Sequence, residues 1–321
     1  MSMPNHIRWG VVATVKAPLL TIADWAAYHL DLGAHRVIVY LDAPDDAAFD
    51  ALNAHPKLRV VKADAANWRS SKRPDRHQPR QSANLRHAYR RKARDLDWLA
   101  HIDVDEFLWP LNPLEDQLAA LSIDCLCARI RPIEALSGEG QNLPDGQIPF
   151  KAMTNDRAQR QRETQDIYPT FGAHLNGGFL SHVAGKLFIR TGQDGLEMKI
   201  HNIWQDGVQN PGQVELTGTE LCHLHAKSFG DWQASFRYRH EQGAYRAELA
   251  PNRARESGGM TMHELFAAIL EDAGDAGLRA FYDEVCLATP DLRARLDAHG
   301  LLRLYDLDLA EKRRKQFPDL A

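Results

Sequence analysis

Three carboxylates lie inside an otherwise apolar stretch of the sequence, WLAHIDVDEFLWP, at residues 98–110. They are Asp103, Asp105 and Glu106, and the two aspartates are separated by one residue. Two carboxylates on an extended segment offer the hard oxygen ligands that Mg²⁺ and Mn²⁺ prefer, and such ions complete their shell with water and substrate phosphates. The spacing therefore indicates metal-assisted binding of a diphosphate. The alternative is that the acids cap a helix or pair with arginines.

A strongly basic segment leads into these acids. Residues 69–94 hold ten Lys or Arg against a single acid, Asp75. A diphosphate needs cationic partners as well as a metal, and the arginine fork matches phosphate oxygens. Arg80, Gln81 and Asn84 fall at the start of an expected helix, where free backbone N–H groups attract anions. The later basic residues of the segment are expected to form a solvated helix face.

Histidines form a second group of candidate ligands. The stretch ELCHLHAKS at 220–228 alternates, so His223 and His225 share one face of an expected strand. One of them, with His225 favoured because it lies nearer the carboxyl end of the strand, could occupy a metal position left open by the two aspartates. The alternative is a pair of hydrogen-bonded surface histidines. His201 is a weaker substitute, and His29 is expected to be a packed histidine.

Strands and helices alternate along the N-terminal third of the chain. The expected elements are strands at 9–15, 36–41, 58–63 and 98–103 and helices at 22–33, 46–54 and 81–97. This order favours a parallel sheet with helices on both faces. Ligands of such sheets bind beyond the carboxyl ends of the strands, which is where the acid pair falls.

The rest of the chain predicts a second part of different character. Further strands are expected at 126–132, 185–190, 197–203 and 220–226. The stretch 137–184 is rich in Gly, Asn and charge and is expected to be irregular. From residue 228 the pattern is helical and amphipathic, and the final residues look like a solvated tail. We therefore expect one domain at 1–227 and a helical C-terminal extension at 228–321.

Composition sets broad limits on the function. Apolar residues make up 44% and charged residues 26% of the 321, and the net charge is -4, which gives no reason to expect a nucleic-acid partner. The four cysteines show no regular framework, so reduced thiols are expected. No secretion signal and no apolar run of about 18 residues stands out. A cytoplasmic protein is predicted, with peripheral attachment to the inner face of the membrane left open.

Four segments together resemble bacterial family 2-type glycosyltransferases, in particular a subgroup with an HIDxDEF signature. The segments are ATVK (13–16), ADWAAYHLDLGAHRVIVYLDAPDD (23–46), RQSAN (80–84) and DWLAHIDVDEFLWP (97–110). The resemblance covers about the first 135 residues well and the strands between 185 and 226 more loosely. The resemblance does not extend to the helical C-terminal third.

The resemblance implies an α/β fold of the glycosyltransferase A type, with a mostly parallel Rossmann-like sheet that binds a nucleotide-sugar. In this fold, four residues are expected to lie beside the nucleotide base: Thr14, Val15, Lys16 and Asp42. Three more are expected to bind the metal and the sugar diphosphate: Asp103, Val104 and Asp105. Many relatives carry Asn-Glu where this chain has Ala17 and Pro18, so a contact made there must be lost or moved.

A catalytic base is less well determined by the sequence. An inverting sugar transfer needs a carboxylate that removes the proton of the acceptor hydroxyl. Glu134, at the exit of an expected strand, is the first candidate, and Asp206 is the second. Either could instead be a loop acid without a role, and a retaining enzyme would need no base at this position.

These expectations combine into one function. It is a glycosyltransferase, dependent on Mn²⁺ or Mg²⁺, that passes a sugar from a UDP-sugar to a hydroxyl of a glycan or glycolipid, as in polysaccharide biosynthesis. A nucleotidyltransferase or phosphohydrolase could use the same aspartates, but TVKAPLL after the first strand is not a Gly-rich phosphate loop. A third alternative is a non-enzymatic binding module whose acids pair structurally.

Overall fold

The computed structural model describes residues 6–68, 72–181, 183–225, 228–241, 245, 251, 255 and 259–320. The chain forms two compact units, each assembled from separate stretches. Unit 1 comprises residues 1–132, 184–221 and 308–321, and unit 2 comprises residues 133–183 and 222–307. This division differs from the expected boundary after residue 227, because residues 133–183 pack with the C-terminal helices and the end of the chain returns to unit 1.

Unit 1 is built on four parallel strands. They are β1 (Trp9–Val15), β2 (Arg36–Leu41), β3 (Leu58–Lys62) and β4 (Trp98–His101), in the order β4-β1-β2-β3. Every residue of β1 is buried, because the apolar run WGVVATV has sheet neighbours on both sides and helices on both faces. The parallel β-α-β pattern predicted from the sequence is therefore present.

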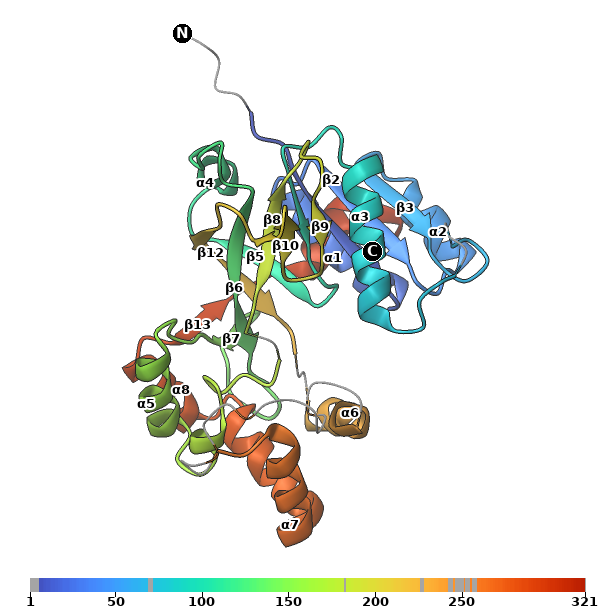
Figure 1. Ribbon diagram of the computed structural model, residues 1–321. Helices are drawn as coiled ribbons and strands as arrows, with labels where there is room; N and C mark the ends of the chain where they lie inside the picture. The colour runs from blue at the N-terminus through green and yellow to red at the C-terminus, as the bar shows by residue number, and fades with distance from the viewer. Residues whose placement is uncertain are drawn as a thin grey trace. The chain divides into compact units, whose positions relative to one another are not determined.

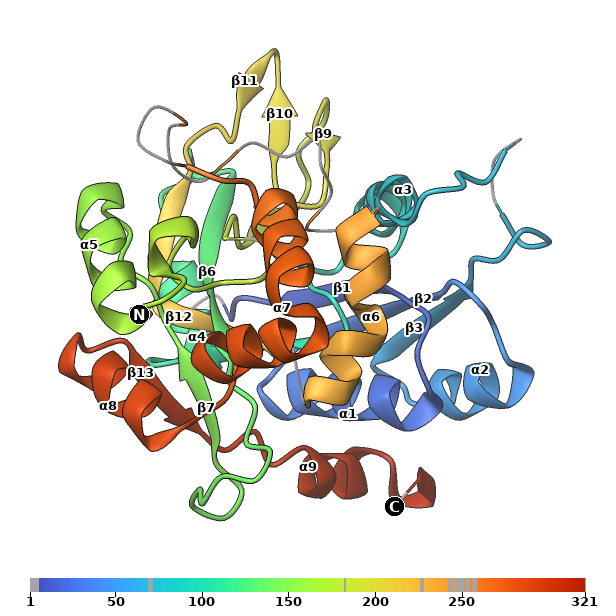
Figure 2. The ribbon, with the colours of Figure 1, turned by 90° about the horizontal axis from the view of Figure 1, so that it is seen from below.

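Helices connect these strands and cover the sheet. They are α1 (Leu19–Asp31), α2 (Asp46–Asn53) and α3 (His77–Arg91). Figures 1 and 2 show α3 on one face of the parallel strands and α1 on the other. Trp25 and Tyr28 of α1 donate hydrogen bonds to the backbone carbonyls of Glu106 and Leu108, which joins α1 to the segment that follows the acid pair.

The sheet changes direction beyond β4. Strand β8 (Lys186–Arg190) runs antiparallel to β4, and the first residues of β6 (Cys127–Ala135) run antiparallel to β8. The expected mostly parallel sheet is thus partly antiparallel. A parallel neighbour of β4 would need a crossover connection, usually a helix. Strand β8 follows instead the short η1 turn (Gly172–His174) and a stretch whose described residues contain no helix.

The remaining elements of unit 1 join the main sheet, form a separate three-stranded sheet or are helices outside the sheets. They are β5 (Glu106–Pro110), α4 (Leu114–Ala119), β9 (Glu197–Met198), β10 (Ile203–Gln205), β11 (Val208–Gln209), most of β12 (Val214–His223), α9 (Leu309–Gln316) and η3 (Pro318–Leu320). Strands β5 and β12 belong to the main sheet, and β9, β10 and β11 form the separate one. Helix α9 packs against α1, where Arg313 pairs with Asp24 and Lys315 pairs with Asp31 at 2.5 Å. The tail is therefore not fully solvated as expected: it forms a helix against α1, and two of its basic residues pair with acids of α1.

Unit 2 combines a small antiparallel sheet with helices. Its elements are the end of β6, β7 (Ile148–Lys151), α5 (Arg157–Ile167), η1, α6 (Phe229–Glu241), α7 (Met262–Val285), α8 (Pro290–Ala298) and β13 (Leu302–Tyr305). Trp232, Phe266 and Phe281 pack ring against ring between α6 and α7. The stretch expected to be irregular thus contains β7 and α5. Within the described residues, none of the helices has the length and apolar character that spanning a membrane requires.

Candidate functional site

The first half of α3 is hydrogen-bonded to the carboxyl ends of the parallel strands in unit 1. The helix begins at His77, so Gln81 and Asn84 lie inside it and not at its start, where the sequence predicted them. Asn84 Nδ2 donates to Thr14 Oγ1 at the end of β1, at 2.9 Å. Gln81 Nε2 donates to Asp103 Oδ1 just beyond β4, at 2.6 Å. Thr14, Gln81 and Asn84 are buried, so these bonds fix the side chains of two strand ends against one helix. The structure therefore brings together residues that the sequence assigned to a common site.

Asp42, just beyond β2, is held by the same helix and by the loop before it. Arg80 of α3 makes a bidentate pair with this carboxylate, with Nη2 at 2.7 Å from Oδ2, and Arg73 reaches Oδ1 at 2.7 Å. Burial raises the pKa of Asp42, but bonds to His77 and Arg80 and the charge of Arg73 lower it by more, so it lies well below its usual range. Arg80 thus positions Asp42, and its fork is already engaged.

A buried lysine neutralises part of the acid group. Lys186, on β8, is fully buried, and its Nζ lies 2.6 Å from Asp103 Oδ2 and 3.2 Å from Glu106 Oε2. Glu106 also accepts the backbone N–H of Asp103 at 2.8 Å, which closes the turn after β4. Burial raises the pKa of Asp103, but the charge and the hydrogen bond of Lys186, together with its other neighbours, lower it by more. Lys186 therefore holds this turn in one shape with Asp103 ionised.

The remaining residues predicted at this edge differ in exposure. Lys16 and Asp105 are exposed, Val104 is half-buried, and Val15 is buried within β1. His101, the last residue of β4, is buried, and burial lowers its pKa to about 4, so it is neutral at physiological pH. Asp105 thus presents a carboxylate to solvent next to Asp103, whose charge is balanced by Lys186.

The donor set of this turn fits a hard divalent cation. Asp103, Asp105 and Glu106 carry three negative charges against the single ammonium of Lys186. Magnesium-type ions take one or two protein carboxylates and fill their other positions with water and phosphate oxygens. Because Lys186 and Gln81 occupy both oxygens of Asp103, Asp105 is the more accessible ligand.

Glu134, predicted as a possible base, lies in unit 2 and is buried. Its carboxylate accepts the backbone N–H groups of Leu180 and Ser181 at 2.9–3.1 Å and pairs with Lys151 at 3.2 Å. Burial raises the pKa of Glu134, but the Lys151 ammonium, the hydrogen bond from Ser181 and the neighbouring histidines together lower it by more, to well below the usual range. A carboxylate stabilised in this way is a weak base, so the contacts favour a binding or positioning role.

The two predicted histidines lie beside Glu134. Across the part of the chain that the structure describes, Glu134, His223 and His225 are the one group of three or more His, Cys, Asp or Glu residues whose ligating atoms all lie within 4.8 Å of one another. The structure therefore groups the histidines with Glu134 in unit 2, whereas both aspartates belong to unit 1. The strand expected at 220–226 ends at His223, and Ala226 lies outside the described residues.

Asp206, the second candidate base, sits in a hairpin turn between β10 and β11. Both Asp206 (φ 51°) and Gly207 (φ 80°) have the left-handed backbone that two-residue hairpin turns require. Asp-Gly is a common sequence for this turn, and both residues are exposed. The turn therefore accounts for Asp206 without a catalytic role.

The other histidines weighed from the sequence have structural partners. His201 Nδ1 lies 2.9 Å from the carbonyl of Gly185. His29 is buried in α1, where Nδ1 lies 2.8 Å from the carbonyl of Trp25, and burial lowers its pKa to about 4. The prediction of a packed His29 is confirmed. All four cysteines are free thiols, as expected.

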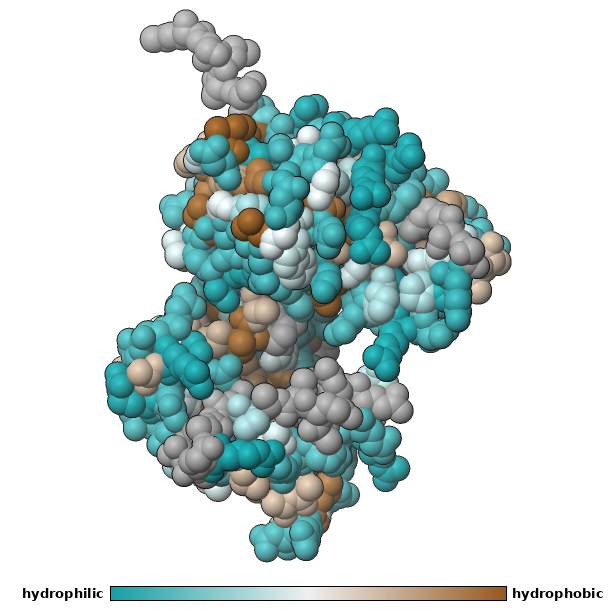
Figure 3. Space-filling model, in the orientation of Figure 1, coloured by the Kyte–Doolittle hydropathy of each residue, from teal (hydrophilic) through white to brown (hydrophobic). Residues whose placement is uncertain are grey.

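The basic residues at the end of α3 form a solvated face. Arg90, Arg91 and Arg94 are exposed, and Figure 3 shows the outer surface of this helix as hydrophilic. Residues 69–71, at the start of the basic segment, lie outside the described residues. These arginines are exposed as expected, whereas Arg80, which the sequence suggested for a phosphate, is paired with Asp42.

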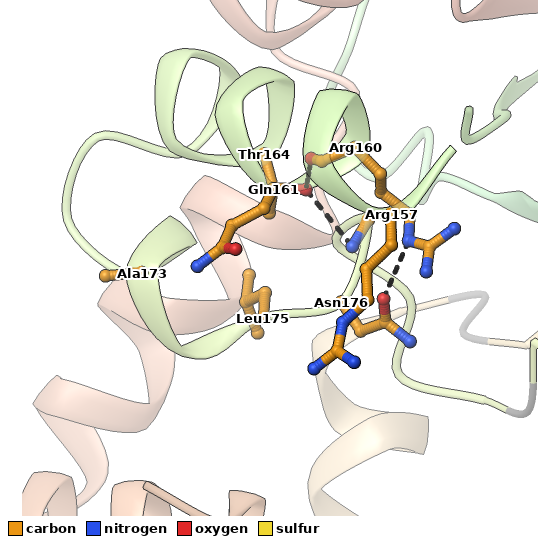
Figure 4. Close-up of a pocket in the computed structure, with 8 residues that line it drawn as sticks. Arg157, Arg160, Gln161, Thr164, Ala173, Leu175 and Asn176 are labelled. Carbon is orange, nitrogen blue, oxygen red and sulfur yellow. Dashed lines mark hydrogen bonds between the residues drawn. The ribbon is translucent and has the colours of Figure 1, made fainter. Parts of the chain in front are cut away.

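A small polar hollow lies on unit 2 beside α5. It is about 310 Å³ in volume, including space open to solvent, and Figure 4 shows residues that line it. Arg160 donates to Asn176 Oδ1 at 2.8 Å and to the carbonyls of Thr154 and Asn155, which holds one wall of the hollow in place. The hollow can accommodate a few polar atoms of a ligand but is too small to enclose a sugar nucleotide.

Sequence reasoning missed the cations that partner the buried acids. Lys186 begins the strand KLFIR and Lys151 ends the strand IPFK, and both are buried. A charged residue in a short apolar strand is a signal that a carboxylate partner lies nearby, because an unpaired buried charge is strongly disfavoured. Arg73 was one of many basic residues in its segment, and nothing in the local pattern distinguished it.

Comparisons with known proteins assign the family. Glycosyltransferase family 92 matches residues 12–253, which is most of the chain. A comparison with curated proteins found no significant match. The motifs suggest a family 2-type enzyme, whereas the matching family is 92; both are families of glycosyltransferases. The chain belongs to glycosyltransferase family 92 and is therefore a glycosyltransferase.

Proposed function

We propose that the enzyme binds a nucleotide-sugar, with UDP as the nucleotide, at the carboxyl edge of the parallel strands of unit 1. The observation that carries this proposal is the set of bonds from the first half of α3 to the ends of three strands. In open α/β sheets this edge is the usual ligand site. A fold of the glycosyltransferase A type would use it for the donor.

Within this proposal, each polar residue has a task. Asp42 and Thr14, which α3 holds in place, contact the nucleoside, and Asp103 with Asp105 binds Mn²⁺ or Mg²⁺ at the diphosphate. When bound, the metal would offset the negative charge of the departing diphosphate. Lys186 keeps Asp103 ionised and the turn closed before the donor arrives. The acceptor is the hydroxyl of a glycan or a glycolipid.

The rival functions differ in their expected chemistry. A nucleotidyltransferase would cleave the nucleotide between its phosphates and would form no glycosylated acceptor. A binding module with purely structural acids would bind nucleotide equally well with and without metal. The match to a glycosyltransferase family favours sugar transfer over both.

Metal dependence gives the first test. We expect UDP to bind in the presence of Mn²⁺ and much more weakly in EDTA, because the ion would bridge the carboxylates and the diphosphate. Calorimetry on the full chain measures both affinities. A screen of sugar nucleotides with Mn²⁺, scored by release of the nucleoside diphosphate, would then identify the donor. Equal affinity with and without metal would rule out the bridge.

A second test compares two arginines of α3. Arg80→Ala removes the fork that holds Asp42, so we expect Asp42 to lose its bond to the nucleoside and UDP binding to weaken by about 1.5–3 kcal/mol, the usual value of a hydrogen bond to a charged group. Arg91→Ala changes an exposed side chain and should alter binding by less than about 0.5 kcal/mol. Calorimetry with Mn²⁺ present measures both. Similar losses in the two variants would show a diffuse basic field rather than a specific contact.

A further inference from the structure

Glu134, His223 and His225 form a group of side chains that the donor site does not use. All three belong to unit 2, and their ligating atoms lie within 4.8 Å of one another. Glu134 comes from the end of β6, while His223 ends β12 and His225 follows it. Three ligating side chains from two segments far apart in the sequence therefore converge on one point.

We propose that Glu134, His223 and His225 bind a divalent transition-metal ion, separately from the metal proposed at Asp103 and Asp105. Two imidazoles and one carboxylate form a donor set typical of Zn²⁺, Mn²⁺ and Fe²⁺ sites in proteins. It is softer than the all-oxygen set of the aspartates, and so it prefers Zn²⁺ or Co²⁺ to Mg²⁺.

The surroundings of Glu134 suit a ligand. Its carboxylate is fixed by the N–H groups of Leu180 and Ser181 and by Lys151. Lys151 is itself held by the carbonyls of Gly178 and Val285, at 2.6 and 2.8 Å. Hydrogen bonds of this kind orient ligating carboxylates in metal sites. Lys151 pairs with Oε1 of Glu134, whereas Oε2 accepts hydrogen bonds from backbone N–H groups only. Oε2 is therefore the oxygen that the ammonium leaves to a metal.

His225 is in the protonation state that ligation requires. Burial lowers the pKa of His225 to about 3, so its ring is neutral at physiological pH and has a lone pair to donate. The rings of His223 and His225 meet edge to face with their centroids 5.4 Å apart. This arrangement leaves the two rings in contact without stacking.

One cation lies at a nitrogen of His225. Arg239 Nη1 donates to His225 Nε2 at 3.4 Å, so this nitrogen carries the lone pair of the neutral ring. A metal at Nε2 therefore replaces Arg239. Removing the Arg239 side chain should raise the metal affinity, because a competing donor and a repelling charge are both lost.

Co²⁺ binding to the full chain tests the site without relying on activity, so failure of the donor proposal would not affect the result. We expect the wild type and an Asp103→Asn/Asp105→Asn double variant to show the visible absorption of histidine-bound Co²⁺. His225→Ala should bind at least tenfold more weakly, as should Glu134→Gln. His299→Ala, a histidine of unit 2 outside the cluster, is the control and should bind like the wild type.

Two outcomes would overturn the proposal. Loss of Co²⁺ from the double aspartate variant would mean that the histidines serve the aspartate site, and unchanged binding in His225→Ala would mean that they bind no metal. Circular dichroism establishes that each variant is folded, and His225→Ala, which changes a half-buried side chain outside helix and strand, decides the matter if Glu134→Gln does not fold. Tighter binding by Arg239→Ala would support the assignment, and weaker binding would contradict it.

Discussion

Asp105→Asn is expected to reduce sugar transfer by about a hundredfold or more, the usual loss when a group that stabilises transition-state charge is removed. The carboxylate is exposed next to Asp103, whose charge is balanced by Lys186, so it is the most accessible ligand for the proposed metal. Asparagine keeps the size of the side chain and removes the charge. Turnover of the identified donor at saturating Mn²⁺ measures the effect.

The folded state should survive this substitution. An exposed side chain usually changes the free energy of unfolding by less than about 0.5 kcal/mol, so the melting temperature should stay near that of the wild type. Asp124→Asn, which changes another exposed acid of unit 1, is the matched control and should retain full turnover. If Asp105→Asn keeps full activity, or if it fails to fold, the metal-binding role is wrong.

Lys186→Met is expected to destabilise the protein by about 3 kcal/mol, the lower end of the cost of breaking a buried ion pair. The lower end applies because Asp103 is 29% exposed, whereas Glu106 and Lys186 are buried. Without the ammonium, two carboxylates face each other across the turn after β4. Denaturant unfolding of the full chain measures the change.

The comparison that isolates this effect uses two further variants. Lys57→Met removes an exposed lysine of unit 1 and should change stability by less than about 0.5 kcal/mol. Glu106→Gln combined with Lys186→Met should cost less than the sum of the single changes, because each removes a partner of the other. Additive costs would show that the lysine and the glutamate do not interact.

The sequence predicted the parallel part of the fold well. Apolar runs such as WGVVATV and RVIVYL, separated by helical patterns, define strands and crossovers locally, so the order β-α-β-α-β needs no tertiary information. The acid pair directly follows such a strand, which placed Asp103 at the sheet edge. Gln81 and Asn84 contact that edge with their side chains, but they do so from inside α3, which begins at His77, and not from the helix start that the sequence predicted.

The sequence did not predict where the antiparallel strands lie. The run KLFIR identifies a buried strand but not its neighbour, because pairing depends on how the chain returns from unit 2. For the same reason the sequence could not predict the division into two units, and the expected domain boundary after residue 227 differs from it. Residues 133–183 and 222–307 join into one unit through contacts between distant segments.

The sequence by itself determined the residue types of the candidate site, its family resemblance and its place at the end of a parallel strand, since each depends on local order along the chain. Only the tertiary structure decided the charge partners. Lys186 and Asp103 are 83 residues apart, and their contact follows from the antiparallel register of β8 beside β4. Glu134 meets His223 and His225 for a similar reason: β6 and β12 pair within the fold, and no local pattern encodes which side chains such a pairing brings together.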